Sequence, residues 1–268
     1  MLNTIGFLGC GNMGGAIARA VCKAADPQNV WLANRTAAKA EALAAELGCN
    51  TTINDEVAGR CDLIFLAVKP QMMEELLAPL RFTLAERPSR FVLCSMAAGL
   101  SIARIQEMAG GDCPVIRIMP NTPASVGAGM IQYCTSNVTA AEEAEFLKLM
   151  APAGRLDAVP EGLIDAASCV SGCGPAWVYQ FIEALADGGV ACGLPRAKAQ
   201  EYAAQMVLGS AKLVLESGQH PGALKDAVCS PGGSTIQGVR VLEEKGLRGA
   251  VMDAVIASYN KTKEMGKG

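Results

Sequence analysis

Three glycines near the start of the chain have the spacing that suits binding of a dinucleotide. Gly9, Gly11 and Gly14 form G-x-G-x-x-G directly after the apolar run Ile5–Leu8, and helix-forming residues follow. The first glycine permits a tight turn, the second lets the backbone approach a pyrophosphate, and the third lets the helix pack on the strand. Free N–H groups at the helix start would bind the phosphates. The pattern predicts a dinucleotide site; the alternative is a glycine-rich turn without a ligand.

Residues after the second predicted strand indicate which dinucleotide binds. NAD-binding folds place an acidic residue about 20 positions after the glycines, where it binds the ribose hydroxyls. This chain has Asn34 there, followed by Arg35, with Lys39 one turn further on. With no carboxylate at this position to repel a 2′-phosphate, Arg35 can bind it, which favours NADPH. The alternative is that Arg35 and Lys39 are ordinary solvated charges.

Three segments at predicted strand ends could complete a cofactor cleft. They are A-V-K-P (67–70), M-A-A-G (96–99) and M-P-N-T-P (119–123). Ligands of open parallel sheets bind beyond the carboxyl ends of the strands, and Pro70 biases the preceding residue toward an extended backbone. Small residues in the second and third segments leave room for a nicotinamide. Each segment could be a plain connecting loop, but three on one rim favour a site.

Two glycine-rich segments in the second half of the chain are candidates for a substrate site. They are S-G-C-G-P-A-W (171–177) and S-P-G-G-S-T (230–235). The second precedes a predicted helix, so Ser234 or Thr235 could cap that helix while the amides near Gly232 and Gly233 bind an anion. The alternative is an ordinary capped helix start. The need for a substrate site facing the nicotinamide favours the anion site.

The hydrophobic pattern divides the chain into an α/β half and a helical half. Apolar runs alternate with stretches of helical periodicity, which predicts right-handed crossovers and a parallel, doubly wound sheet. The predicted strands are Ile5–Leu8, Val30–Ala33, Leu63–Val68, Phe91–Cys94, Val115–Met119 and, last, Met130–Cys134. Helices between and after them include Met13–Ala25, Ala37–Leu47 and Ala140–Leu149. We therefore expect a Rossmann domain over residues 1–158.

Beyond about Leu156 only helices are expected, so residues 159–268 are predicted to form an all-helical domain. These helices are Leu163–Val170, Pro175–Cys192, Arg196–Glu216, Ser234–Glu244 and Leu247–Lys263. The helix over 196–216 is apolar on most faces and must be covered on most faces. A domain of about 110 residues could hardly cover it alone. A partner subunit, and therefore a homo-oligomer, is expected.

The composition argues against several other classes of function. The chain has 268 residues and a formal net charge of −3 without a basic stripe, so nucleic-acid binding is not expected. Its eleven cysteines are scattered without a C-x-x-C pair, and His220 is the only histidine, so neither a zinc site nor a thiol-redox motif is expected. Such thiols suit a reducing cytoplasm. Glycines interrupt the N-terminal apolar stretch and no Lys or Arg precedes it, which argues against a signal peptide.

Together, seven segments resemble the pyrroline-5-carboxylate reductase family. They are G-F-L-G-C-G-N-M-G, A-V-K-P-Q, M-P-N-T-P, S-G-C-G-P-A, A-D-G-G-V, G-L-P-R and H-P-G…K-D…S-P-G-G-S-T, in the order and spacing of that family, from about Ile5 to Tyr259. The resemblance implies NAD(P)H-dependent reduction of the cyclic imine 1-pyrroline-5-carboxylate to L-proline, the last step of proline biosynthesis. It also implies a Rossmann domain and a helical dimerisation domain that interlocks two subunits, with dimers sometimes assembling into decamers.

The resemblance also implies roles for individual residues. The implied cofactor contacts are Gly9, Cys10, Gly11, Asn12, Met13, Gly14, Asn34, Arg35, Asn54, Ala67, Val68, Lys69, Pro70 and Ala97. The implied substrate contacts are Ser234 and Thr235, with Glu161 nearby. No metal is implied. Some relatives carry a side-chain amide where this chain has Ala227, so one ancillary cofactor contact is in question.

An imine substrate suits the residues present. An alcohol-forming dehydrogenase needs a proton donor or Lewis acid at the carbonyl oxygen. The β-hydroxyacid dehydrogenases resemble this layout but place a lysine on the helix after their second glycine motif, where this chain has none before Lys198. His220 lies in an H-P-G turn and is interpreted as a loop residue. A protonated imine needs no separate activation.

We therefore expect hydride to pass directly to the iminium carbon. Thr235 would hydrogen-bond the ring nitrogen, and the amides around Gly232, Gly233 and Ser234 would bind the carboxylate, so that most of the acceleration comes from orientation. Two alternatives stay open. One is a reductase of another cyclic imine, and the other is a non-catalytic NADP-binding regulator.

Overall fold

The computed structural model describes residues 2–265, and these fall into two compact units. The first unit contains residues 2–173 together with 258–265, and the second contains Gly174–Ala257. The domain boundary that we expect after residue 158 from the change in hydrophobic pattern stays a prediction.

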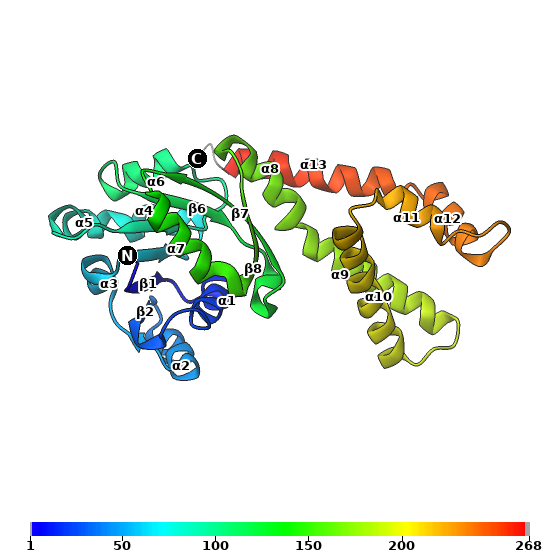
Figure 1. Ribbon diagram of the computed structural model, residues 1–268, viewed down its shortest axis with the longest axis horizontal. Helices are drawn as coiled ribbons and strands as arrows, with labels where there is room; N and C mark the ends of the chain where they lie inside the picture. The colour runs from blue at the N-terminus through cyan, green and yellow to red at the C-terminus, as the bar shows by residue number, and fades with distance from the viewer. Residues whose placement is uncertain (1, 266–268) are drawn as a thin grey trace. The chain divides into compact units, whose positions relative to one another are not determined.

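An eight-stranded sheet forms the centre of the first unit (Figure 1), with strand order β3-β2-β1-β4-β5-β6-β7-β8. The strands are β1 Ile5–Leu8, β2 Val30–Ala33, β3 Asn50–Thr51, β4 Leu63–Leu66, β5 Val92–Ser95, β6 Val115–Met119, β7 Gly129–Ser136 and β8 Gly154–Ala158. Because β1 lies between β2 and β4, the chain leaves the centre of the sheet in opposite directions on its two sides. A crevice for a ligand opens at such a point, beyond the carboxyl ends of the strands.

Helices cover both faces of this sheet. They are α1 Asn12–Val21, α2 Ala37–Leu47, α3 Asn54–Arg60, α4 Met73–Leu77, α5 Arg81–Glu86, α6 Ile102–Ala109, α7 Ala140–Met150 and α8 Glu161–Ser171. Side chains of α1, α2 and α7 share one core with Phe7 and Phe65, whose rings stack at 4.5 Å. Side chains of α3 to α6 share the other core with Leu8 and Leu66. Successive strand residues point to opposite faces, which is why uniformly apolar strands suit this sheet.

The doubly wound α/β fold is confirmed, but three expectations about the sheet are wrong. β7 pairs antiparallel with β6, with Val115 opposite Ser136. The connection over residues 120–128 is too short for a parallel crossover, which needs a dozen residues or more. The strands β3 and β8 were not expected. β3 has only two residues, and β8 reads G-R-L-D-A at the sheet edge with no fully buried side chain, so neither carries a hydrophobic signal.

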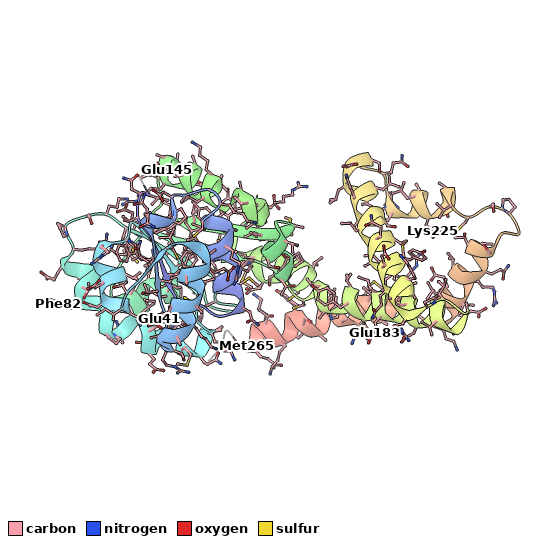
Figure 2. The ribbon with its side chains drawn as sticks, turned by 90° about the horizontal axis from the view of Figure 1, so that it is seen from below. Glu41, Phe82, Glu145, Glu183, Lys225 and Met265 are labelled. Carbon is pink, nitrogen blue, oxygen red and sulfur yellow. The ribbon has the colours of Figure 1, made fainter. Side chains whose placement is uncertain are left out.

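The second unit consists of helices, as expected. They are α9 Gly174–Ala191, α10 Arg196–Ser217, α11 Pro221–Ala227, α12 Ser234–Glu244 and α13 Leu247–Met265, whose last turns belong to the first unit. Among residues 174–257 only Ala186, Ala199 and Ala203 are buried. Large apolar side chains on α10, such as Leu208 and Leu215, are exposed, and side chains project from all sides of these helices (Figure 2). Within this unit, therefore, few side chains are fully buried.

Within residues 2–265 no helix combines the length and the apolar character needed to cross a membrane.

Candidate active site

The glycine turn after β1 has the geometry that its spacing predicts. Gly9 has a φ of +112°, and a Cβ there would lie 2.5 Å from the Ala67 carbonyl oxygen. A Cβ on Gly14 would lie 2.4 Å from the Gly9 carbonyl oxygen. On Gly11, by contrast, a Cβ would meet no described atom within 4 Å. Packing therefore requires the first and third glycines, whereas the second leaves space for a ligand to approach the backbone.

The start of α1 is suited to binding an anion. Its N-cap is Gly11, which has no side chain to satisfy the first amides of the helix. The helix begins at Asn12, so the first-turn N–H groups are at the end of the glycine turn, where the positive end of the helix dipole also lies. The predicted contacts Asn12 and Met13 belong to this first turn.

Asn34 connects the glycine turn to the loop after β2. The Cys10 N–H donates to Asn34 Oδ1 at 2.9 Å, and Asn34 Nδ2 donates to the Thr36 carbonyl at 2.9 Å. Where an NAD-binding fold has a carboxylate for the ribose, this chain therefore has an amide that binds its own backbone. These bonds place Arg35 beside the glycine turn.

A cleft of about 620 Å³ lies over the ends of β1, β2 and β4. It is lined by Leu8, Gly9, Gly11, Asn34, Arg35, Thr36, Lys39, Asn54, Ala67, Val68, Lys69, Gln71, Met72, Glu75 and Leu76. Arg35, Lys39 and Lys69 supply three cationic side chains, against the single carboxylate of Glu75. A cleft with this balance suits a ligand with several phosphate groups.

Most of the predicted cofactor residues meet in this cleft, and a few lie beside it. Cys10, Asn12, Met13 and Gly14 continue the glycine turn into α1, and Pro70 follows Lys69. Ala97 is buried in the loop after β5, outside the described lining of the cleft. Thr36, Gln71, Met72 and Glu75 line the cleft but are not among the predicted contacts, because residues of these types in this order form no recognisable motif.

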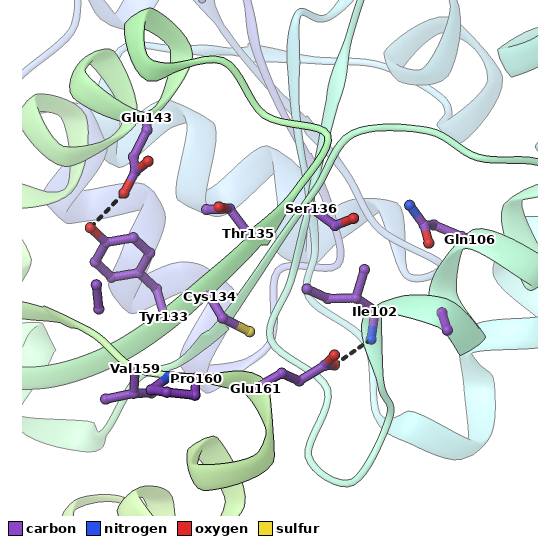
Figure 3. A pocket seen from close by; sticks show the side chains of 12 residues that line it. Ile102, Gln106, Tyr133, Cys134, Thr135, Ser136, Glu143, Val159, Pro160 and Glu161 are labelled. Carbon is purple, nitrogen blue, oxygen red and sulfur yellow. Dashed lines mark hydrogen bonds between the residues drawn. The ribbon is translucent and has the colours of Figure 1, made fainter.

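Glu161 lies at the start of α8 and lines a different cleft, of about 600 Å³ (Figure 3). Its Oε1 accepts a hydrogen bond from the Ile102 N–H at 2.6 Å and lies 3.4 Å from a guanidinium nitrogen of Arg117. In the same cleft the Tyr133 hydroxyl donates to Glu143 at 2.8 Å, and burial followed by this bond raises the pKa of Tyr133 to about 12. The Glu161 carboxylate thus binds the Ile102 N–H and lies beside the Arg117 guanidinium. Its contact with substrate stays a prediction.

Arg117 on β6 is a buried cation that the sequence pattern did not reveal. Its side chain is 3% exposed and is paired with Asp165 of α8 at 2.5 Å. Lys263, near the end of α13, lies 3.6 Å from the other oxygen of Asp165. A buried charge must be paired, so this group joins β6, α8 and the end of α13 within the first unit.

In the second unit, the S-P-G-G-S-T segment begins α12 differently from the expectation. We expected Ser234 or Thr235 as the cap, but the N-cap is Gly233 and Ser234 is the first helical residue. Gly232 has a φ of +71°, and this turn lets the Gly233 N–H donate to the Ser230 carbonyl at 3.0 Å. The extended N-cap conformation therefore falls one residue earlier, so both hydroxyls belong to the first helical turn. The substrate roles of Gly232, Gly233, Ser234 and Thr235 stay predictions.

His220 has a structural position in the same unit. It is the N-cap of α11, and its Nδ1 accepts a hydrogen bond from the Gly222 N–H at 3.0 Å. Its interpretation as a loop residue is confirmed. Among residues 2–265 no group of three or more His, Cys, Asp and Glu side chains could hold a metal ion.

The sheet order, the glycine turn and the cationic cleft define a protein of the dinucleotide-binding Rossmann class. Residues 161–265 match the family model described as pyrroline-5-carboxylate reductase dimerisation, and residues 4–99 match the one described as NADP oxidoreductase coenzyme F420-dependent. The chain belongs to the pyrroline-5-carboxylate reductase family.

Individual relatives agree with this assignment. The pyrroline-5-carboxylate reductase of Escherichia coli (strain K12) is 43% identical over 271 residues, covering 100% of both chains. The enzyme of that name from Synechocystis sp. is 46% identical over 215 residues, covering 80% of this chain and 79% of the relative. The crystal structure of Plasmodium falciparum pyrroline carboxylate reductase with NADP bound is 35% identical, covers 99% of each chain and has a TM-score of 0.89.

Proposed function

We propose that this chain reduces 1-pyrroline-5-carboxylate to L-proline with NADPH, as the last step of proline biosynthesis. The observation that carries the proposal is the 43% identity, over the full length of both chains, to the E. coli pyrroline-5-carboxylate reductase. The glycine turn and the cationic cleft supply what such an enzyme needs for its coenzyme, because they combine free helix amides with Arg35, Lys39 and Lys69.

Arg35 is proposed to select the phosphorylated coenzyme. It lines the cleft beside Asn34, whose amide stands where a ribose-binding carboxylate would repel a 2′-phosphate. A charge-assisted hydrogen bond contributes about 1.5–3 kcal/mol. That amounts to about ten- to a hundredfold in affinity, so NADPH is the preferred coenzyme and NADH a weaker one.

The reaction needs few chemical groups from the protein. The reduced nicotinamide supplies a hydride, and the carbon of the protonated C=N bond accepts it, so the ring nitrogen becomes the amine of proline. Thr235 is proposed to hydrogen-bond that nitrogen, and the backbone amides of Gly232, Gly233 and Ser234 to bind the substrate carboxylate. Because the iminium is already an electrophile, these residues act by orientation, which supplies most of the rate enhancement.

The active form is proposed to be a homodimer, and such dimers can assemble further into a decamer. Support comes from the match of residues 161–265 to a dimerisation model and from the exposed apolar side chains of α10. A row of exposed large apolar side chains on one helix marks a surface that a partner subunit covers. Equilibrium sedimentation at micromolar concentration tests this, because a monomer would contradict it and the mass distinguishes dimer from decamer.

We place the enzyme in the cytoplasm, with no nucleic-acid or membrane partner.

A steady-state assay tests the activity itself. The purified chain is mixed with 1-pyrroline-5-carboxylate and each nicotinamide in turn, and we expect substrate-dependent oxidation that is faster with NADPH. A six-membered cyclic imine serves as the comparison substrate. Faster turnover of that imine would indicate a different imine reductase. Binding of NADPH, seen by fluorescence, without turnover of any imine would indicate a regulator.

A further inference from the structure

Helix α8 forms hydrogen bonds at its first and last residues, one to the start of α6, just after the loop that follows β5, and one to the loop that follows β6. At its start, Glu161 accepts the Ile102 N–H at 2.6 Å, just after the loop that follows β5 (Figure 3). At its end, the Ser171 carbonyl accepts a hydrogen bond from Asn121 Nδ2 at 3.0 Å, in the loop that follows β6. Both loops are therefore held by one helix.

Asn121 uses both ends of its side-chain amide. It is 7% exposed, and while Nδ2 donates to Ser171, Oδ1 accepts from the Met130 N–H at 3.1 Å. An amide is the side chain that offers a donor and an acceptor together in this geometry. Because the Asn121 side chain is buried, losing either bond leaves one of its own polar atoms unsatisfied. The loop after β6 is thereby fixed to α8 on one side and to β7 on the other.

The helix that holds this loop is itself anchored to the sheet. The buried pair between Arg117 and Asp165 joins the middle of α8 to β6, the same strand that precedes Asn121. Thr262 near the end of α13 lies 3.8 Å from the Cys169 sulfur, between α8 and α13. Within the first unit, α8 is therefore held in place by β6 on one side and by the end of α13 on the other.

The loops after β5 and β6 lie on the side of the sheet away from the ribose-binding loop of β2. In the strand order, β2 is on one side of β1, while β4, β5 and β6 follow on the other. A dinucleotide laid across the strand ends, with its adenosine ribose beside Asn34 and Arg35, extends its nicotinamide toward β5 and β6. The segment Thr122–Val126 after Asn121 also packs against α1, which carries the pyrophosphate site.

We infer that Asn121 is a positioning residue for hydride transfer: by bonding the loop after β6 to the last turn of α8, it fixes one wall of the nicotinamide end of the site. The inference rests on the proposed reductase function. Asn121 acts through the backbone of its loop and not on the reacting atoms. A shift of about 1 Å at such a wall costs about a hundredfold in rate, whereas coenzyme binding depends on the glycine turn and Arg35 and is preserved.

Two substitutions that affect the same turn of α8 separate positioning from general stability. Asn121→Ala removes the bond to the Ser171 carbonyl. Gln132→Ala is the matched control, because it removes the acceptor that the Ser171 hydroxyl binds at 2.8 Å and keeps the Ser171 carbonyl that Asn121 binds. For each variant we would measure kcat, the KM for both substrates, the Kd for NADPH by fluorescence, the Tm, and the primary isotope effect with NADPH deuterated at the transferred position.

We expect Asn121→Ala to lower kcat about ten- to a hundredfold, to raise the isotope effect because hydride transfer becomes slower than product release, and to leave the Kd for NADPH unchanged. Gln132→Ala should lower the Tm about as much as Asn121→Ala does, and should keep the wild-type kcat and isotope effect. An unchanged kcat for Asn121→Ala, or an equal loss of kcat in both variants, overturns the inference.

A second variant covers the case in which Asn121→Ala does not fold. Asn121→Leu has a similar volume and no polar atoms, so it removes both hydrogen bonds without leaving a cavity or adding a buried charge. We expect the same loss of kcat, and a wild-type kcat in this variant overturns the inference. If the unsubstituted chain reduces no imine at all, the proposed function fails, which is distinct from an active wild type with an active Asn121 variant.

Discussion

The Cys10 N–H donates to Oδ1 of Asn34 across 2.9 Å, and this bond joins the glycine turn after β1 to the loop after β2. The two residues lie where the backbone turns toward the pyrophosphate and where the ribose is bound in a Rossmann fold. Together with the Gly9 N–H bond to the Ala33 carbonyl at 2.8 Å, this side-chain amide holds the two parts of the cleft against each other.

Removing that amide should weaken coenzyme binding. For Asn34→Ala we expect the Kd for NADPH to rise about tenfold, because the loss of a hydrogen bond worth about 1–1.5 kcal/mol loosens the turn. Fluorescence titration measures the Kd. Asn34→Asp is the matched variant, since its carboxylate still accepts from Cys10 but repels a 2′-phosphate, so binding of NADPH should suffer more than binding of NADH. Equal effects on the two coenzymes would contradict the assignment of this loop to the phosphorylated ribose.

Substitution of Arg35 should change the coenzyme preference. For Arg35→Ala we expect about ten- to a hundredfold weaker binding of NADPH, which corresponds to a charge-assisted hydrogen bond of about 1.5–3 kcal/mol. Binding of NADH, which lacks the 2′-phosphate, should stay as it is and serves as the internal control. The ratio of kcat/KM for the two coenzymes provides the measurement. If both coenzymes lose affinity together, Arg35 binds something other than the 2′-phosphate.

Loss of the Thr235 hydroxyl should slow turnover. We expect kcat to fall about ten- to a thousandfold in Thr235→Ala, as for removal of one placed donor that contributes about 1–4 kcal/mol. Thr235→Ser keeps the hydroxyl and should recover most of the rate. Steady-state kinetics with 1-pyrroline-5-carboxylate and NADPH decides the matter, and an unchanged kcat in the alanine variant would remove Thr235 from the mechanism.

Glu142 should make the fold sensitive to acid. Its hydrogen bond with Arg90, together with further bonds from Thr139, lowers its pKa from 4.5 to about 2 despite partial burial. Because the folded state binds this proton less tightly than the unfolded chain, the stabilisation is complete above about pH 4.5 and is lost as the pH falls toward 2. Urea unfolding at several pH values measures the free energy of unfolding. We expect the difference between wild type and Glu142→Gln to shrink across this range; a difference independent of pH would count against the ion pair.

The buried Arg117 should be sensitive to removal of one partner but tolerant of removal of both. Arg117→Ala leaves Asp165 without its main cation in a buried site, and we expect a loss of about 3–5 kcal/mol in unfolding free energy. In the double variant Arg117→Met with Asp165→Leu, apolar groups replace both charges, so most of the stability should return. Denaturant unfolding measures both. A double variant as unstable as Arg117→Ala would contradict the assignment of the loss to an unpaired buried Asp165.

Local patterns were enough to predict much of the first unit. The spacing of Gly9, Gly11 and Gly14 follows from the turn, the ligand approach and the helix packing that a strand–turn–helix needs. The uniformly apolar strand around Leu63–Leu66 indicated a sheet covered on both faces. These features are visible in the sequence because each depends on neighbours within a few residues of the chain.

The hidden features depend on contacts between distant parts of the chain. Asn121 and Ser171 are 50 residues apart, and Arg117 and Asp165 are 48 apart, so no periodicity joins them. The pairing of the polar edge strand β8 became visible only in the folded sheet, whereas the short connection over residues 120–128 already excludes a parallel β7. The cap of α12 is an exception, because it depends on a local feature, the left-handed backbone of Gly232, which places Gly233 at the N-cap.

The sequence by itself thus determined the class of coenzyme site, since glycine spacing and apolar alternation are local consequences of backbone geometry. Only the tertiary structure decided which polar side chains hold the strand-end loops in place. Hydrogen bonds and ion pairs of that kind have strict requirements for distance and direction, and the chain meets these only after the sheet and its helices have packed together.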